Sequence, residues 1–161
     1  MKTLFLVRHA KSSRDDPSLP DRERPLNDRG RHDAAAMGKR LASRKLKPRL
    51  IVSSPALRAL TTAQLIADQI GYEYKDIVID DSLYASSVVN LLAVVHALDN
   101  ELDGVMLCGH NPEFTDLAYR LSGEITDMPT CAVAEFHYDT KAWGHVGEIT
   151  PSKVTLYTPK T

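Results

Sequence analysis

Short apolar runs alternate along this chain with segments that carry apolar residues at helical spacing, and this alternation constrains the fold most. The runs at Met1–Val7, Leu50–Val52 and Val105–Cys108 show no polar alternation, which is typical of strands buried on both faces of a sheet. A helical pattern follows each run after a loop or turn. Strands that alternate with helices favour an α/β layer fold with a largely parallel sheet.

The remaining elements follow from the same patterns. Four helices are predicted, at Arg31–Arg44, from Ser54-Pro55 to Ile70, at Ser86–Leu98 and from Asn111-Pro112 to Leu121. A polar residue followed by proline begins two of them, because this pair suits the N-cap and the first helical position. Further strands are expected at Ile77–Ile79, Ala132–Tyr138, Gly147–Ile149 and Val154–Tyr157, the C-terminal ones in antiparallel pairs. The polar, proline-containing residues 11–27 are predicted to form a loop.

Length, charge and cysteine content narrow the classes of function. The 161 residues fit a single domain spanning 1–161 and are enough to bury one core without disulfides or a metal. A net charge of −1 argues against binding nucleic acid or an acidic membrane through bulk charge, and no apolar run reaches the length of a membrane span. Cys108 and Cys131 lack metal-ligand spacing, and two thiols without a targeting segment predict a cytoplasmic location.

Cationic and imidazole residues mark the ends of three predicted strands. The first strand runs into Arg8-His9, the second is followed by Arg58 one helical turn later, and the strand at 105–108 runs into Gly109-His110. Ligands bind outside the carboxyl ends of strands in open α/β sheets, and two of these segments also begin helices, whose free N–H groups attract anions. An anion would also explain Arg58, which opposes the helix dipole in a first turn. These side chains are therefore expected to converge on a phosphate pocket.

The available residue types favour a histidine nucleophile in this pocket. No Ser or Cys has a recognisable base-and-orienter partner, there is no glycine-rich phosphate loop, and no cluster has metal spacing, so no metal or other cofactor is expected. A neutral imidazole is a competent nucleophile near pH 7. His9 would attack phosphorus in line, while Arg8, Arg58 and a protonated His110 would neutralise the equatorial oxygens. Water would then hydrolyse the phosphohistidine.

Four ordered motif blocks connect the chain to a known family. They are Leu6-Val7-Arg8-His9-Ala10, Pro25-Leu26-Asn27-Asp28-Arg29-Gly30, Ser53-Ser54-Pro55-Ala56-Leu57-Arg58-Ala59 with Thr62-Ala63, and Gly109-His110-Asn111-Pro112. Together they resemble the histidine phosphatase superfamily, and most closely its small SixA-like branch of phosphohistidine phosphatases. The resemblance covers roughly the whole chain. It implies a three-layer α/β/α sandwich like that of phosphoglycerate mutase, no metal, His9 as the catalytic nucleophile, and Arg8, Arg58 and His110 as phosphate ligands.

The proton-donor glutamate of the mutase-like members has no counterpart here. The matching region, 80–85, contains no glutamate, and Asn111 stands where the acid-phosphatase branch has an aspartate after its second histidine. An alkoxide leaving group needs a proton as the bond breaks, whereas a phosphorylated imidazole can be protonated on its other nitrogen beforehand. The missing donor therefore favours phosphohistidine on a protein as the substrate. Asp15, Tyr84, water and the substrate itself remain alternatives for the donor.

Two further residues join the predicted substrate-binding set. Lys11 would steer an anionic substrate unless it only forms a solvated loop face, and the hydroxyl of Ser13, or that of its neighbour Ser12, would bond a phosphate oxygen. The four histidines outside the motif blocks are predicted to be structural: His32, His96, His137 and His145.

Three functions stay open at this point. They are a phosphohistidine protein phosphatase, a phosphatase of small phosphorylated substrates, and a binding module for phosphate or a phosphoprotein without turnover. The short span from Arg58 to the helix at Val88 leaves no room for a lid domain, which favours a phosphoryl group carried on a protein surface. Inorganic phosphate or sulfate is expected to bind the same pocket.

Overall fold

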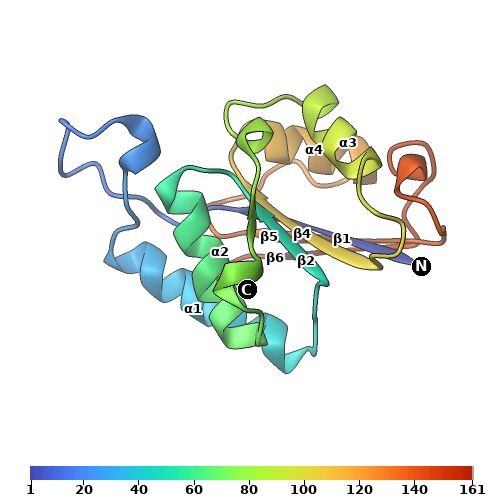
Figure 1. The fold of residues 1–161 in the computed structure, drawn as a ribbon, viewed down its shortest axis with the longest axis horizontal. Coiled ribbons are helices and arrows are strands. Elements are labelled where there is room, and N and C mark those ends of the chain that lie inside the picture. Colours follow the sequence, from blue (N-terminus) through green and yellow to red (C-terminus); the bar gives the residue numbers. More distant parts are fainter. Residues whose placement is uncertain (161) are drawn as a thin grey trace.

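Six strands form one mixed sheet in a computed structural model that describes residues 1–160 (Figure 1). The strand order is β3-β2-β4-β1-β5-β6. The four strands at one side are parallel: β1 (Lys2–Arg8), β2 (Leu50–Ser53), β3 (Val78–Ile79) and β4 (Gly104–Gly109). Antiparallel pairs join β5 (Val133–Tyr138) to β1 and β6 (Lys153–Tyr157) to β5. The predicted parallel sheet with antiparallel C-terminal strands is confirmed.

Helices cover both faces of this sheet, as the predicted α/β/α sandwich requires. In Figure 1, α1 (Asp28–Ser43) and α2 (Leu57–Ile70) lie on one face, while α3 (Val88–His96) and α4 (Glu113–Ser122) lie on the other. Alternate residues of β1 feed the two cores, because successive side chains of a strand point to opposite faces. Leu4 and Leu6 pack toward α3 and α4, and Phe5 and Val7 pack toward α1 and α2. Each such side chain contributes about 1.5–3 kcal/mol of burial free energy.

All four helices begin elsewhere than the sequence patterns predict. Helix α3 starts at Val88 and not at Ser86, and α4 starts at Glu113, with Pro112 and not Asn111 at its N-cap. Helix α1 starts at Asp28, ahead of the expected Arg31, because the Asn27 side chain accepts a hydrogen bond from the Gly30 N–H at 2.8 Å and caps the helix. Helix α2 starts at Leu57, so the prediction that Ser54 caps it is wrong. The Ser54 hydroxyl instead accepts from the Ala56 N–H at 3.2 Å and contacts His110.

Three further segments differ from the predicted secondary structure. Residues Gly147–Ile149 do not form the expected strand: Val146 and Ile149 make only an isolated bridge. Strand β3 is limited to Val78–Ile79 at the sheet edge, where both residues are exposed. The loop between β1 and α1 contains a short 3-10 helix, η1 (Asp21–Glu23), which matters for the site described below.

Close backbone packing at two glycines brings the site segments together. A Cβ on Gly30 would lie 2.1 Å from the Lys11 carbonyl oxygen, so only glycine lets the β1–α1 loop rest on the start of α1. A Cβ on Gly109 would lie 2.5 Å from Phe114 Cζ, so the end of β4 can approach α4 only because residue 109 has no side chain.

Among residues 1–160, none of the helices combines the length and apolar character that crossing a bilayer requires.

Candidate active site

The carboxyl ends of β1, β2 and β4 meet at one cleft of about 910 Å³. Strand pairing places Arg8 opposite Gly109, and the His9 N–H donates to the Gly109 carbonyl at 3.0 Å. The first turn of α2, which follows β2, brings Arg58 to the same edge. The structure thus gathers the four residues predicted to converge, because all of them line this cleft: Arg8, His9, Arg58 and His110.

His9 is held with one ring nitrogen engaged and the other available. Its Nδ1–H donates to the Ala10 carbonyl at 2.7 Å, and since a carbonyl can only accept, the lone pair of the neutral ring lies on Nε2. Burial, followed by the nearby Arg58 and Arg8 guanidinium groups, lowers the pKa of His9 from 6.5 to about 4. At pH 7 the imidazole is therefore neutral, which is the form that can act as a nucleophile.

His110 lies beside His9 and is held by a contact with the Ser54 hydroxyl. The two ring centroids are 5.3 Å apart, and His110 Nε2 is 2.8 Å from the Ser54 hydroxyl. Burial and the neighbouring His9 and Arg58 lower the pKa of His110 from 6.5 to about 3, while Asp21 opposes that change. Without a bound anion His110 is therefore neutral at pH 7, whereas the protonated His110 predicted from the sequence refers to the site with a phosphoryl group bound. Only an added negative charge, such as a phosphoryl dianion, would favour the charged ring.

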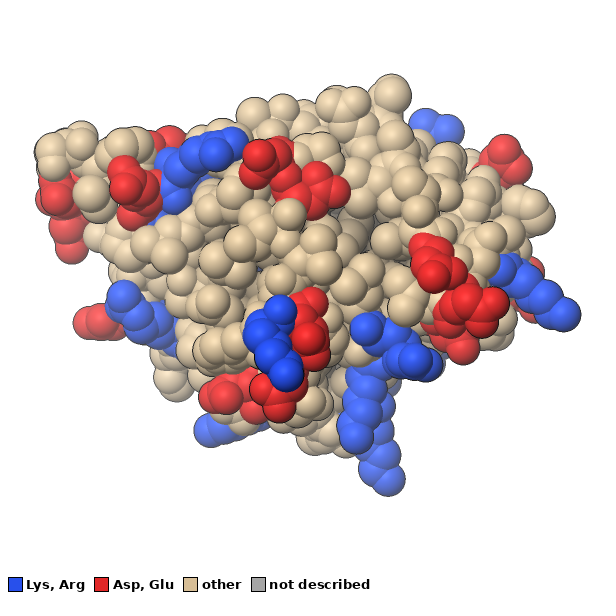
Figure 2. All heavy atoms as spheres, in the orientation of Figure 1, with Lys and Arg blue, Asp and Glu red and all other residues tan. Residues whose placement is uncertain are grey.

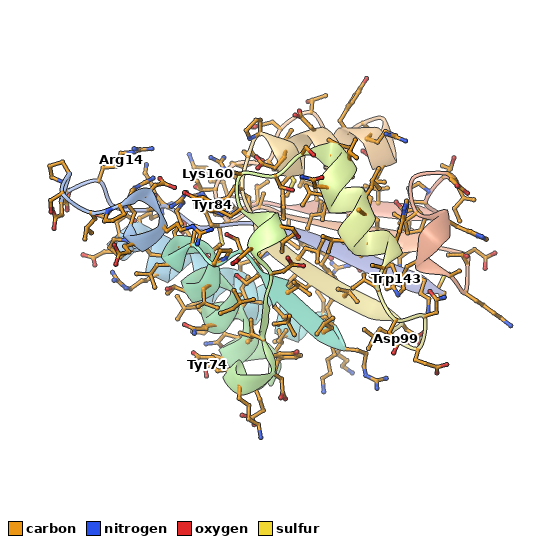
Figure 3. The ribbon with its side chains drawn as sticks, turned by 45° about the horizontal axis from the view of Figure 1, so that its top comes forward. Arg14, Tyr74, Tyr84, Asp99, Trp143 and Lys160 are labelled. Atoms are coloured by element: carbon orange, nitrogen blue, oxygen red, sulfur yellow. The ribbon has the colours of Figure 1, made fainter. Side chains whose placement is uncertain are left out.

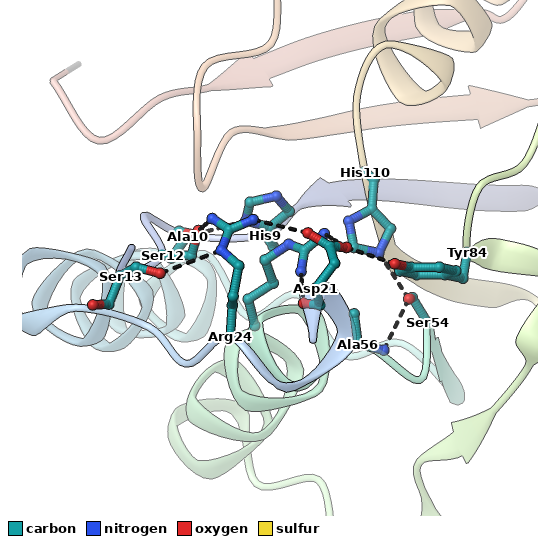
Figure 4. A network of polar contacts seen from close by, with 11 residues as sticks. His9, Ala10, Ser12, Ser13, Asp21, Arg24, Ser54, Ala56, Tyr84 and His110 are labelled. Carbon is teal, nitrogen blue, oxygen red and sulfur yellow. Dashed lines mark hydrogen bonds and ion pairs between the residues drawn. The ribbon is translucent and has the colours of Figure 1, made fainter. Parts of the chain in front are cut away.

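Arg58 has an anionic partner that the sequence did not identify, Asp21, whose contacts with Tyr84 and Arg24 are drawn in Figure 4. Its Nη1 donates to the Asp21 carbonyl at 2.7 Å and its Nη2 to Asp21 Oδ2 at 2.9 Å. The Tyr84 hydroxyl donates to the same Oδ2 at 2.5 Å, and Arg24 Nη1 contacts Asp21 Oδ1 at 3.0 Å. The hydrogen bond from Tyr84, followed by those from Arg58 and Arg24, holds the pKa of Asp21 well below its ordinary value. Asp21 is therefore ionised.

The residues of the β1–α1 loop that were predicted to bind substrate differ in whether they line the cleft. Lys11 lines the cleft and is exposed, as steering an anion requires. Ser13 is not among the described residues that line it, and its hydroxyl accepts from the Asp15 N–H at 3.1 Å within the loop. Ser12 lines the cleft instead, and its hydroxyl accepts from Arg24 Nη2.

The candidate proton donors differ in whether they line the cleft and in their hydrogen-bond partners. Asp15 does not line the cleft among the described residues. Tyr84 does, but its hydroxyl is bonded to Asp21, which raises the pKa of Tyr84 above its ordinary value. A glutamate that sequence reasoning missed, Glu113 in the first turn of α4, also lines the cleft. Its Oε2 accepts a hydrogen bond from the Ser86 N–H at 2.9 Å.

Sequence signals for the missed residues were weak. Glu113 follows Asn111-Pro112 directly, and an acidic residue in a first helical turn is explained by the helix dipole alone. Asp21 lies in a polar loop without periodicity, and only the need of Arg58 for an anion pointed toward such a residue. In the part of the chain that the structure describes, no group of three or more His, Cys, Asp or Glu side chains is placed to hold a metal ion.

Comparison with known proteins agrees with this geometry. The family model of the histidine phosphatase superfamily (branch 1) matches residues 4–84. An uncharacterised chloroplastic protein of Arabidopsis thaliana is 32% identical over 151 residues, covering 88% of this chain and 69% of that protein. A crystal structure of a putative phosphohistidine phosphatase SixA from Agrobacterium tumefaciens is 30% identical, with a TM-score of 0.77 over 84% of this chain and 90% of that chain.

A second solved structure extends the likeness to almost the full length. The protein histidine phosphatase SixA complexed with tungstate is 25% identical, with a TM-score of 0.83, and the match covers 98% of this chain and 97% of that chain. The matched family model includes Arg8, His9 and Arg58, and the structural match extends over nearly the whole fold. This chain therefore belongs to the histidine phosphatase superfamily.

Proposed function

We propose that this protein is a phosphatase that takes a phosphoryl group from phosphohistidine on a protein, through a phosphohistidine intermediate at His9. The observation that carries the proposal is the neutral His9 ring, fixed through Nδ1 in a cleft that is also lined by four arginines and a second imidazole. The likeness to solved SixA structures supports the choice of substrate class.

The first step is an in-line displacement at phosphorus. The Nε2 lone pair of His9 forms the new N–P bond, while the bond from phosphorus to the leaving group breaks and takes its electron pair away. Arg8 and Arg58 stabilise the charge on the nonbridging oxygens, where it gathers in the transition state. The incoming dianion also favours protonation of His110, which then adds a third positive group.

The second step returns the enzyme to its starting form. Water attacks the phosphorus of phosphorylated His9, the N–P bond breaks, and its electron pair returns to Nε2. Both hydrogens of the attacking water stay on the phosphate product, which leaves as dihydrogen phosphate, and His9 is again the neutral ring with its proton on Nδ1. Arg8, Arg58 and His110 serve this transition state in the same way, because charge again lies on the three equatorial oxygens.

The contacts of two carboxylates in the cleft favour a leaving group that needs no acid. Three donors keep Asp21 ionised, so this residue does not deliver a proton at pH 7. The Glu113 Oε2 is engaged by the Ser86 N–H rather than directed at a ligand. A phosphorylated imidazole protonated on its other nitrogen leaves as a neutral ring. An alkoxide, by contrast, would require a general acid.

Access to the cleft also suits a phosphoryl group presented by another protein. Between α2 and α3 the chain forms only two short 3-10 helices and the two-residue β3, so no lid covers the site from that segment. On the face shown in Figure 2, acidic and basic side chains are interspersed, and no large field of one sign is present. Recognition is then expected to depend on the cleft rather than on overall charge. A cytoplasmic location stays a prediction.

Glu113 gives the second candidate function its specific support. It is 8% exposed and lines the cleft, so a shift of its Ser86 contact during binding would free a carboxyl group beside the leaving group. In that case the protein would hydrolyse small phosphomonoesters.

One experiment separates these functions. The purified protein is incubated with a phosphohistidine protein and with p-nitrophenyl phosphate, with His9→Ala and Glu113→Gln in parallel. Fast release from the phosphohistidine protein alone, lost in His9→Ala and retained in Glu113→Gln, is expected. Fast ester hydrolysis that Glu113→Gln abolishes would establish the second function. No His9-dependent release from either substrate would leave a binding module without turnover.

A further inference from the structure

We propose that Asp21 is a positioning residue, which holds Arg58 and Arg24 in place around the phosphoryl site. This inference rests on the proposed function, because it assigns these two guanidinium groups to the phosphoryl group. Asp21 itself does not react. It acts through the side chains that it orients, and its own side chain is 51% exposed, whereas those of Arg58 and Arg24 are 9% and 13% exposed.

The contacts of Asp21 fix the plane of the Arg58 guanidinium. Two nitrogens of this group donate to two oxygens of one residue, the main-chain carbonyl at 2.7 Å and Oδ2 at 2.9 Å. A fork with two bonds to one partner cannot rotate about either bond alone. A guanidinium has five N–H groups, so about three remain for an anion in the cleft.

Arg24 is oriented from the same carboxylate. Its Nη1 donates to Asp21 Oδ1 at 3.0 Å, its Nε to the Ser13 carbonyl at 3.3 Å, and its Nη2 to the Ser12 hydroxyl. Arg24 also lines the cleft, and its charge is among those that lower the pKa of His9. Asp21 thus connects two cations of the cleft that come from different elements, the β1–α1 loop and α2.

Tyr84 anchors Asp21 from the opposite wall of the cleft. Its hydroxyl lies 2.5 Å from Asp21 Oδ2, its ring meets the His110 ring edge-on at 5.5 Å, and Arg22 stacks over it at 4.7 Å. Arg14 marks the β1–α1 loop and Tyr84 the segment before α3 in Figure 3. The carboxylate therefore joins two walls that are 63 residues apart in sequence.

A different role for Asp21 would be that of a resident anion, which the phosphoryl group displaces from Arg58. Displacement would break charge-assisted bonds to Arg58 and Arg24 and the bond from Tyr84 together. Such bonds are about twice as strong as neutral ones. This arrangement favours a fixed carboxylate, and the displaced anion becomes an outcome of the test.

The test compares Asp21→Asn with Asp16→Asn as a matched control. Asp16 lies in the same loop and is exposed, and its side chain bonds only to Ser18 in the described contacts. Equilibrium binding of tungstate, measured by calorimetry, and kcat/KM with a phosphohistidine protein are determined for each variant. Asp21→Asn is expected to weaken both by about 10- to 100-fold, as changes in outer-shell partners do in metal sites. Asp16→Asn is expected to leave both unchanged.

A double-mutant cycle then shows whether Asp21 acts through Arg58. In an Arg58→Ala background, Asp21→Asn should weaken tungstate binding much less than it does in the parent protein, because the group that it positions is gone. Thermal unfolding of each variant is recorded, so that loss of fold is not taken for loss of binding.

Three results would overturn the proposal. Tighter tungstate binding by Asp21→Asn would identify a displaced anion, unchanged binding would leave Asp21 without a role, and full additivity with Arg58→Ala would remove the positioning link. Tungstate binding requires no turnover. A parent protein that binds tungstate through Asp21 but hydrolyses nothing would contradict the proposed function and leave the positioning role intact.

Discussion

Two polar clusters lie at opposite ends of the same sheet, and they differ in how their charges are balanced. In the cluster that extends from the middle of β5 to the amino end of β1, Glu135 accepts from the Tyr157 hydroxyl at 2.7 Å and from His137 Nε2 at 2.7 Å, while His137 Nδ1 lies 3.3 Å from the Thr3 hydroxyl. These groups satisfy one another beside a pocket of only about 280 Å³. Such a cluster is typical of structural polar groups.

The cluster at the carboxyl ends is not balanced in this way. Guanidinium groups and two imidazoles share the larger cleft, and their mutual repulsion adds to burial in lowering the pKa of both His9 and His110. Cations held together with too little negative charge form a site for an anion, and the scaffold supplies the free energy that keeps them there. The same residue type, histidine, thus has a chemical role at one end and a structural role at the other.

The largest expected effect comes from replacing His9 by alanine at the carboxyl ends of the strands, with His137→Ala in the other cluster as its counterpart. His9→Ala should lower kcat/KM on the phosphohistidine protein by about 10⁴-fold or more, because the nucleophile is lost. His137→Ala should leave kcat/KM nearly unchanged and lower the free energy of unfolding by about 1–3 kcal/mol, since Glu135 loses a partner. Steady-state kinetics and urea unfolding measure the two. Equal kinetic losses would contradict the separation of roles.

Arg58→Ala should have the next largest effect. Removing one preorganised donor reduces transition-state stabilisation by about 2–4 kcal/mol, which lowers kcat/KM by about 30- to 900-fold. Lys47→Ala, at the small pocket near the amino ends, is the control and should change kcat/KM little. An Arg58→Ala variant with the kcat/KM of the parent protein would show that Arg58 does not stabilise the transition state.

Acid should destabilise the protein through the cleft. The unfolded chain binds a proton on His9 near pH 6.5, whereas the folded chain accepts it only near pH 4. Between these values the unfolded state holds more protons, so the free energy of unfolding falls as pH falls from about 6.5 to 4. His110 acts in the same direction. Urea unfolding at several pH values, with His9→Gln and His110→Gln as references, should show a flatter dependence in each variant. Unchanged slopes would contradict the lowered pKa values.

The smallest effect is expected for the anchor of His110. Ser54→Ala removes the hydroxyl 2.8 Å from His110 Nε2 and should lower kcat/KM by about 3- to 10-fold, the effect of one neutral hydrogen bond. Thr3→Val removes the corresponding partner of His137 at the other end and should not change kcat/KM. If both variants lose activity alike, the loss reflects general stability and not the anchoring of His110.

The sequence by itself determined the layer fold and the four residues at the strand ends. Apolar runs without alternation predict buried parallel strands, and parallel strands have their carboxyl ends at one edge of the sheet. Arg8, His9 and His110 follow such runs directly, and Arg58 follows one by a single turn, so their convergence could be read from their order along the chain.

Only the tertiary structure decided how those residues are held and charged. Asp21 reaches Arg58 across 37 positions, Ser54 reaches His110 across 56, and Glu113 reaches Ser86 across 27. A polar residue in a loop or in a first helical turn is not part of a periodic sequence pattern, so the sequence does not predict which distant residue it contacts. The pKa of His110 likewise depends on burial and on neighbours from other elements, so the neutral state of this ring in the absence of an anion could not be predicted from the sequence.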